Sequence, residues 1–237
     1  MTEQQILKEL LNYDTPSITN VVATYPNDKE LCLGLYEPWD SNWYTDDSLR
    51  CLYPELGRTA GYAVTCVFGA PTLGSNSLTF LDVLRAIGRS PQPVVLLVKN
   101  DFPERYKKKC AISGGNMSTA MKASGVVGVI SDAPTRDVDE VREIGLQYLV
   151  TGATPGHGEF VIKAINVPVS IAGMDVCPGE IIHMDENGAT KFPREHMSGV
   201  LERLKKLIDI EKVRMDKMRK AANVEDVIKI LSGFQEA

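Results

Sequence analysis

The sequence predicts an α/β protein with a mainly parallel sheet, and three observations support this fold class. Apolar runs of strand length recur along the chain, such as PVVLLVKN at 93–100 and VVGVIS at 126–131. Continuous runs of this kind are typical of strands buried on both faces. Segments with helical spacing lie between them, as at 77–88 and 116–124. This alternation of strand and helix indicates βαβ units, whose consecutive strands run parallel.

The N-terminal part of the chain precedes this alternation. Residues 3–12 have the pattern of a short amphipathic helix. A second helix is expected over 14–24, with Thr15 or Ser17 as its N-terminal cap. Residues 25–58 are rich in Pro, Trp and Tyr and follow neither the helical nor the strand period. We expect irregular structure there.

The elements that follow are assigned by the same two periods and by their glycine ends. The predicted strands are 61–69, 93–100, 126–131 and 148–153, and the predicted helices are 77–88, 116–124 and 137–144, the first two ended by Gly88 and Gly125. After residue 160 short strands are expected, with a hairpin turn at DENG, 185–188. Residues 195–231 are helical and Lys-rich. We therefore expect one α/β domain over 1–194 and a C-terminal helical extension over 195–237.

Composition narrows the class of protein. Of the 237 residues, 43% are hydrophobic and 24% are charged, which is typical of a globular chain and excludes a disordered one. No apolar run approaches the roughly 18 residues that a membrane span needs, and the N-terminus does not resemble a secretory signal. The net charge of −5 argues against a nucleic-acid partner. The five cysteines include no CxxC pair, so we expect reduced thiols in a cytoplasmic protein.

The first candidate site is the glycine pair Gly114 and Gly115, which precedes the helix expected at 116–124. Glycine lets the backbone approach a ligand closely, and the free N–H groups of a first helical turn favour an anion. An ordinary glycine turn before a helix is the alternative explanation.

The second candidate is the loop that contains Arg136 and Asp137. A structural explanation also exists, because Asp137 followed by Glu140 resembles a capping box and Arg136 suits a solvated surface charge. The helix at 116–124 runs away from the glycine loop, and the strand at 126–131 runs back towards it. The glycine loop and the Arg136 loop are therefore expected at the same, carboxyl end of the sheet, where α/β proteins bind ligands. Together they would suit a small carboxylate-bearing substrate and a hard divalent cation.

The third candidate is Glu211 in the C-terminal helix. Its three- and four-residue spacings place it on the face that carries the apolar residues Leu204, Leu207, Ile208, Met215 and Met218. A carboxylate on an apolar stripe is costly unless it is paired or ligated. Two alternatives remain open: the stripe faces solvent there, or Glu211 pairs with a nearby lysine. The surrounding segment 203–220 is basic and reads as a solvated helix face.

The remaining polar residues carry weaker signals. His157 lies in the Gly-rich segment GATPGHGEF and is a candidate for substrate contact, whereas His183 alternates with apolar residues and suggests packing. His196 begins a helix. Three aspartates fall in expected turns, namely Asp132, Asp175 and Asp185. No HExxH, GxSxG or P-loop occurs, and no GxGxxG follows a strand, which disfavours a nucleotide or methyl-donor site.

Three segments resemble the RraA-like family: GYAVT at 61–65, GGNMSTAMKASGVVGVISDAPTRD at 114–137 and VPVSIAGMDVCPGEIIHMDENGATKFP at 167–193. That family includes 4-hydroxy-4-methyl-2-oxoglutarate aldolases, which often also decarboxylate oxaloacetate, and many members are labelled demethylmenaquinone methyltransferases. The resemblance covers roughly residues 14–194 and is poor over 25–58. It implies an α/β/β swivelling-domain fold that assembles as trimers or hexamers with sites between subunits. The extension at 195–237 would then pack on a neighbouring subunit.

The resemblance also implies roles for individual residues. In the aldolases, the arginine matching Arg136 binds the carboxylate of the pyruvyl group, and the aspartate matching Asp137 ligates Mg²⁺ or Mn²⁺. A C-terminal glutamate from the neighbouring subunit orients metal-bound water, and Glu211 matches it best by spacing. Backbone amides matching Asn116 and Met117 hold the pyruvyl moiety.

One position departs from the aldolase pattern. The aldolases carry an acidic residue where this chain has Gly115, and such a supporting group typically matters about 10–100-fold. The family's ribonuclease regulators tend to lack the aspartate of the Arg-Asp pair, so Asp137 favours an enzyme.

We therefore expect a class II, divalent-metal-dependent lyase that acts on a 2-oxo acid and releases pyruvate, by aldol cleavage or by oxaloacetate decarboxylation. The alternative is a non-catalytic regulator that binds a ribonuclease or another protein. A methyltransferase is the third and weakest interpretation.

Overall fold

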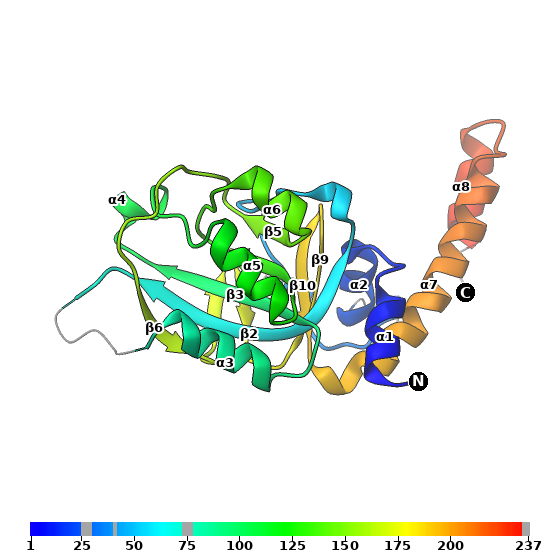
Figure 1. Cartoon of the computed structure of the whole chain (residues 1–237). Helices are drawn as coiled ribbons and strands as arrows, with labels where there is room; N and C mark the ends of the chain where they lie inside the picture. Colours follow the sequence, from blue (N-terminus) through cyan, green and yellow to red (C-terminus); the bar gives the residue numbers. More distant parts are fainter. Residues whose placement is uncertain (25–29, 40–41, 73–77, 234–237) are drawn as a thin grey trace.

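The computed structural model of the chain describes residues 1–24, 30–39, 42–72 and 78–233. Its centre is an eight-stranded mixed sheet with the strand order β1-β5-β4-β3-β2-β9-β10, and β6 also pairs with β2 (Figure 1). The strands of this sheet are β1 (Arg50–Cys51), β2 (Thr59–Gly69), β3 (Val94–Asp101), β4 (Val126–Ser131), β5 (Gln147–Val150), β6 (Val161–Ile165), β9 (Ile181–Asp185) and β10 (Gly188–Phe192). The four central strands β2 to β5 are parallel to one another. The predicted α/β fold with a mainly parallel sheet is therefore confirmed.

The sheet is covered by a different layer on each face. Helices α3 (Phe80–Arg89), α5 (Gly115–Ala123) and α6 (Val138–Ile144) pack on one face, where they share one hydrophobic cluster with β2, β3 and β4. A two-stranded ribbon, β7 (Val169–Ile171) and β8 (Met174–Val176), shares a second cluster with the other face. The result is the α/β/β layering that was expected, in which each of the three helices connects two parallel strands.

A third hydrophobic cluster joins the N-terminal helices to the C-terminal helix. It contains residues of α1 (Glu3–Leu10), α2 (Thr15–Val22) and the first half of α7 (Met197–Met218). Two predicted details were wrong. The cap of α2 is Asp14, whose carboxylate accepts a hydrogen bond from the Ser17 amide at 2.9 Å, and α3 continues through Gly88 to Arg89. The helix start predicted at 77 lies outside the described residues.

The C-terminal extension is two helices rather than one. Helix α7 ends at Met218 and α8 (Val224–Gly233) follows after a turn, and α7 extends away from the sheet (Figure 1). Buried residues occur only in the first half of α7, and α8 has none. Apolar side chains are instead exposed on both helices, including Val213 and Val224. Packing of this extension on a neighbouring subunit stays a prediction. Within the described residues, no helix is both long and apolar enough to cross a membrane.

His183 belongs to the core, as its alternation with apolar residues suggested. It lies in β9 with no exposed surface, and its ring nitrogens contact the Thr15 hydroxyl at 2.9 Å and the Leu10 carbonyl oxygen at 3.3 Å. Burial lowers the pKa of His183 to about 4, against the opposing effect of the Asp185 carboxylate. The buried imidazole is therefore neutral at neutral pH.

We expect the free energy of unfolding to decrease as the pH falls from about 6.5 to about 4. In this window the unfolded chain protonates His183 while the folded chain does not, so protons stabilise the unfolded state by at most about 3 kcal/mol. Urea unfolding across this pH range, on the natural protein and on His183→Gln, measures the effect. The charged groups around the ring, Asp14, Arg58 and Asp185, are the same in both proteins. Identical pH dependence of the two proteins would contradict the prediction.

Candidate functional site

A cavity of about 310 Å³ lies where the two predicted loops meet. Its walls come from three segments, 111–117, 136–140 and 157–160. The first precedes and opens α5, and the second follows β4 and opens α6. The structure therefore brings Gly114, Asn116 and Met117 together with Arg136 and Asp137, as the topology predicted. A cavity of this size suits a small ligand.

Asp137 reaches back from the start of α6 to the glycine pair. Its backbone is left-handed, with φ of 57°, and its Oδ2 accepts a hydrogen bond from the Gly115 amide at 2.9 Å. The side chain makes no capping bond to α6, so the capping-box interpretation was wrong. A Cβ atom at position 114 would lie 2.2 Å from this same Oδ2. Glycine at 114 is therefore required for the carboxylate to sit there.

Arg136 lies beside this carboxylate. Its Nε is 3.6 Å from Asp137 Oδ2, and about a third of each side chain is exposed, 35% and 33%. The Arg136 amide donates to the Ser113 carbonyl oxygen at 3.2 Å, which ties the arginine loop to the glycine loop. The guanidinium is accessible from the cavity, and its planar fork suits a ligand carboxylate.

Glu140 is the site residue that sequence reasoning missed. It lies one turn into α6 and lines the cavity, and a Cβ atom at position 115 would come 1.8 Å from Glu140 Oε2. The Glu140 carboxylate thus occupies the space that a side chain at 115 would take. The available signal was the three-residue spacing from Asp137, which places two carboxylates on one face of a first helical turn.

The first turn of α5 supplies the remaining polar groups. The amide of Gly115 donates a hydrogen bond to the Asp137 carboxylate, and the amide of Ser118 donates to the Gly114 carbonyl oxygen at 2.9 Å. The amides of Asn116 and Met117 belong to the first turn, where a helix provides no carbonyl partner. Such a helix start favours an anionic ligand.

A network of buried hydroxyl groups binds both ends of the glycine loop, at Ser113 and at Ser118. Tyr148, which is fully buried in β5, places its hydroxyl 2.8 Å from Ser113 Oγ and 2.9 Å from Ser118 Oγ. Thr135 Oγ1 donates to the Ser113 carbonyl oxygen at 3.0 Å. Burial raises the pKa of Tyr148, so its hydroxyl keeps its proton as a donor. The network links the glycine loop to the arginine loop.

Tyr148→Phe is expected to lower the free energy of unfolding by about 1–2 kcal/mol, because it removes a hydroxyl that bonds two buried serines. Urea unfolding measures this loss. Tyr106→Phe is the matched control, since Tyr106 is 44% exposed. A Tyr148 variant as stable as the control would show that the network does not stabilise the loop.

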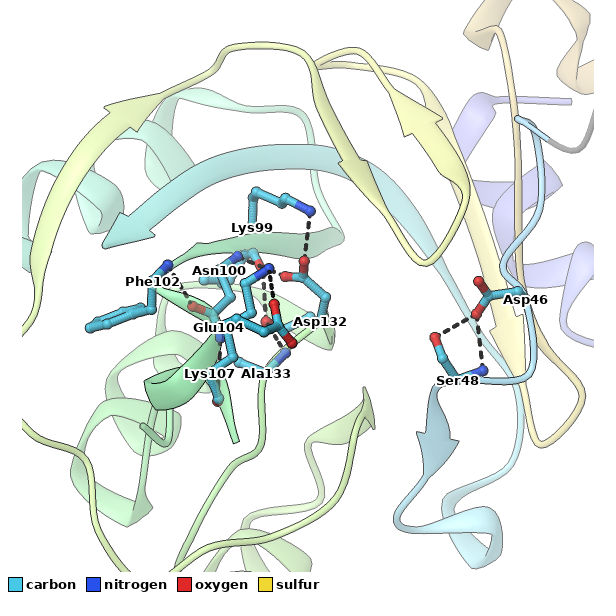
Figure 2. Close-up of polar contacts among 11 residues, drawn as sticks. Asp46, Ser48, Lys99, Asn100, Phe102, Glu104, Lys107, Asp132 and Ala133 are labelled. Carbon is cyan, nitrogen blue, oxygen red and sulfur yellow. Dashed lines mark hydrogen bonds and ion pairs between the residues drawn. The ribbon is translucent and has the colours of Figure 1, made fainter. Parts of the chain in front are cut away.

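Asp132 fixes the base of the arginine loop, a role beyond the turn that was expected of it. Figure 2 shows its carboxylate between Lys99 and Asn100, at the end of β3. Oδ2 lies 2.6 Å from Lys99 Nζ, and Oδ1 accepts from the Asn100 amide at 2.7 Å. The ends of β3 and β4 are therefore held together just before the loop that carries Arg136. The turn predicted at Asp185 is confirmed, because its carboxylate accepts a hydrogen bond from the Asn187 amide in the β9–β10 hairpin. The turn predicted at Asp175 is wrong, because this residue lies within β8.

Glu211 does not line the cavity of its own chain. It lies in the projecting half of α7, where Arg214 NH2 is 3.6 Å from its Oε1. The partner is thus an arginine rather than the lysine that was considered. His157 lines the cavity, whereas His196 precedes α7 elsewhere in the fold. None of the five cysteines forms a disulfide bond. Burial raises the pKa of Cys110, whose thiol donates to the carbonyl oxygen of the cavity residue His157. A thiolate nucleophile is not favoured there.

The RraA-like family profile, described as Aldolase/RraA, matches residues 37–190 of this chain. The chain belongs to the RraA-like family. This RraA-like chain is 34% identical to the 4-hydroxy-4-methyl-2-oxoglutarate aldolase of Thermus thermophilus over 98 residues, which is 39% of this chain and 56% of that protein. It is 28% identical over 125 residues to an uncharacterized protein of Methanocaldococcus jannaschii, covering 52% of this chain and 60% of the relative. The matches thus span less than two thirds of these relatives.

Solved structures share the fold of this RraA-like chain over nearly its whole length. An uncharacterized protein from Pseudomonas syringae superposes with a TM-score of 0.71 at 19% identity, covering 95% of this chain and 93% of that one. A Streptomyces coelicolor protein, described as an unusual member of the RNase ES inhibitor RraA protein family, has a TM-score of 0.65 at 21% identity, with 88% and 94% covered. At these identities the likeness establishes the fold alone.

Proposed function

We propose that this chain is a divalent-metal-dependent lyase that acts on a 2-oxo acid and releases pyruvate. The observation that carries the proposal is the convergence of an arginine fork, two carboxylates and a helix start on one small cavity. Aldolase relatives of the family support the lyase class. We further propose a cytoplasmic homo-oligomer, a trimer or hexamer, in which Glu211 completes the cavity of a neighbouring subunit.

The carboxylate pair fits a hard cation. Among the described residues no group of three or more His, Cys, Asp or Glu side chains forms a metal cluster. Mg²⁺ is commonly bound through one or two carboxylates, with water and substrate oxygens completing the shell. Asp137 approaches the Gly115 amide, and Glu140 lies where a Cβ atom at 115 would be. These two carboxylates would hold such an ion, and oxygen ligands suit Mn²⁺ equally well.

The mechanism uses each group in one role. Arg136 binds the substrate carboxylate through its planar fork, and the amides of Asn116 and Met117 orient the pyruvyl end. A divalent ion held by Asp137 and Glu140 would supply Lewis-acid chemistry at the 2-oxo group. Cleavage breaks the C3–C4 bond. In the aldol substrate the C4 hydroxyl loses its proton to water and becomes the carbonyl of the second product, and in oxaloacetate the C4 carboxylate leaves as CO2. In both cases the electron pair of the broken bond passes to the pyruvyl fragment, and a proton from water at C3 completes pyruvate.

The decisive experiment measures pyruvate release from oxaloacetate and from 4-hydroxy-4-methyl-2-oxoglutarate, with Mg²⁺, with Mn²⁺ and with a chelator. Oxaloacetate decarboxylates slowly with metal alone, so a metal-only background is subtracted. We expect chelator-sensitive turnover above this background and its loss in Asp137→Asn. Absence of turnover on both substrates would contradict the lyase proposal.

The alternative is a regulator that binds a ribonuclease or another protein without catalysis. The argument for it was the missing acid at Gly115, and the Glu140 carboxylate over that position weakens this argument. A regulator needs no metal, so its partner binding should survive Asp137→Ala. Asp137→Ala thus separates the two functions, because it should also abolish the turnover of a lyase.

A further inference from the structure

The segment that follows β5 forms the third wall of the cavity, and the proposed function gives it no role. His157 of this segment lines the cavity. The Thr154 amide donates to the Thr135 carbonyl oxygen at 2.9 Å, which ties the segment to the arginine loop. The Ala111 amide donates to the Gly156 carbonyl oxygen at 3.1 Å, which ties it to the segment before α5. The backbone at His157 is thereby held beside the cavity.

The ring of His157 presents a proton acceptor. Nδ1 lies 2.6 Å from the Gly158 carbonyl oxygen, which can only accept, so Nδ1 carries the proton of the neutral ring. Nε2 is then an acceptor. Imidazole gains and loses a proton near neutral pH, which makes histidine the most frequent general base in enzymes. Because His157 is exposed, a proton taken up at Nε2 can pass on to solvent.

The two reactions proposed for the cavity differ in their need for a base. In aldol cleavage the C4 hydroxyl must lose its proton while C4 becomes a carbonyl. In oxaloacetate decarboxylation no proton leaves the substrate, because the C4 carboxylate departs as CO2. Both reactions then add a proton at C3. A base at the C4 end of the substrate therefore accelerates aldol cleavage and not decarboxylation.

The proposed orientation of the substrate leaves C4 to the third wall. Arg136 holds the carboxylate and the first turn of α5 holds the pyruvyl end, and both belong to the other two wall segments. Asp137 and Glu140, the carboxylates proposed to hold the metal ion, also lie in those segments. The His157 imidazole lines the same cavity from the third segment, so it can receive a proton from the part of the substrate beyond C3.

We infer that His157 is the general base of aldol cleavage and acts at C4. The water that takes the proton of the C4 hydroxyl passes it to Nε2, and the electron pair of the O–H bond forms the C4 carbonyl. The electron pair of the C3–C4 bond passes to the pyruvyl fragment, and the imidazolium returns its proton to solvent. The inference rests on the proposed function for the reaction and for the orientation of the substrate.

The first test compares the two reactions in one variant. His157→Gln should lower kcat for pyruvate release from 4-hydroxy-4-methyl-2-oxoglutarate by about a hundredfold, the low end of what a general base contributes. It should leave oxaloacetate decarboxylation within about threefold of the natural protein. Glutamine is informative because it accepts a hydrogen bond but takes up no proton. An equal loss on both substrates, or full aldol activity with glutamine, would overturn the inference.

Added imidazole tests the proton transfer itself. His157→Ala removes the ring at an exposed position, so imidazole in solution should raise the aldol turnover of this variant by about tenfold. Its oxaloacetate turnover should not rise, and this reading also controls for metal bound by the added imidazole. Recovery confined to the aldol substrate supports the inference, whereas recovery of both activities or of neither contradicts it.

A third measurement separates proton transfer at C4 from proton transfer at C3. Exchange of the pyruvate methyl protons in heavy water with Mg²⁺ reports events at C3 alone, since pyruvate has no C4. NMR should show an exchange rate in His157→Gln within about threefold of the natural protein, and a loss of exchange in Asp137→Asn. Loss of exchange in His157→Gln would assign this histidine to C3 and refute its role at C4.

His196→Gln is the matched control, because it makes the same replacement outside the cavity, at the residue before α7. Its kinetics should equal those of the natural protein. The outcomes also separate the inference from the proposed function. Turnover of oxaloacetate by a natural protein that does not cleave the aldol substrate would refute the inference and leave the lyase. No turnover of either substrate would refute both.

Discussion

Arg136→Lys is expected to lower kcat/KM for pyruvate release by about a hundredfold, which corresponds to about 2.7 kcal/mol of transition-state stabilisation. Lysine keeps the positive charge but has no planar fork, so it cannot bind both oxygens of a carboxylate at once. Lysine also has no Nε–H group, so it would not reproduce the contact in which Arg136 Nε lies 3.6 Å from Asp137 Oδ2. Most of the loss should appear in kcat, because the pyruvyl group would no longer be held at the angle that cleavage needs.

Arg142→Lys is the matched control for this variant. Arg142 lies in α6, is 46% exposed and pairs with Glu55 and Asp139 on the surface. Its replacement should leave steady-state kinetics unchanged. Kinetics of Arg136→Lys within about threefold of the natural protein would remove Arg136 from the site.

Glu140→Ala is expected to weaken Mg²⁺ and Mn²⁺ binding by about 10–100-fold and to lower turnover with it. The double variant Gly115→Asp with Glu140→Ala should recover most of the affinity. The reason is geometric: Glu140 Oε2 lies 1.8 Å from where a Cβ at 115 would be, so a side chain fits there once this carboxylate is gone. Gly115 already has a helical backbone in α5, which aspartate can adopt.

Calorimetric metal titration measures this effect without any assay of activity. Glu143→Ala is the control, because Glu143 is an exposed acid of the same helix that does not line the cavity. Metal affinity that is unchanged in Glu140→Ala would show that Asp137 alone holds the ion. A double variant no better than the single one would show that position 115 cannot carry the acid in this chain.

The sequence allowed the sheet, its parallel strands and the meeting of the two loops to be predicted. Buried parallel strands and their connecting helices produce strong periodic signals, and the order β3-α5-β4 alone places Gly114 and Asp137 at one end of the sheet. The ends of the elements were predicted less well. An N-terminal cap depends on which of several neighbouring side chains accepts a hydrogen bond from the first helical turn, and at α2 this is Asp14 rather than Thr15 or Ser17.

The candidate site was predicted in part for a related reason. Asp137 was given two explanations, a capping box and a carboxylate of the ligand site. In the structure its backbone is left-handed, with φ of 57°, and its side chain bonds the Gly115 amide instead of capping α6. Glu140 was seen as part of a cap, since the space above a glycine is not visible in a sequence. The role expected of Glu211 depends on a second subunit, so the position of Glu211 within one chain does not test that expectation.

The overlap between Glu140 and a side chain at 115 also limits how such a site can change by mutation. The overlapping atom is the end of the long Glu140 side chain, so an acid gained at 115 needs only that this carboxylate turn away. The acid at 115 then takes over the role proposed for Glu140, and Glu140 can be lost afterwards without leaving the site short of an acid. The reverse order, with Glu140 lost first, leaves no second acid. The order of the two changes therefore matters, and proteins with the acid at either position are expected to be connected through chains that carry both.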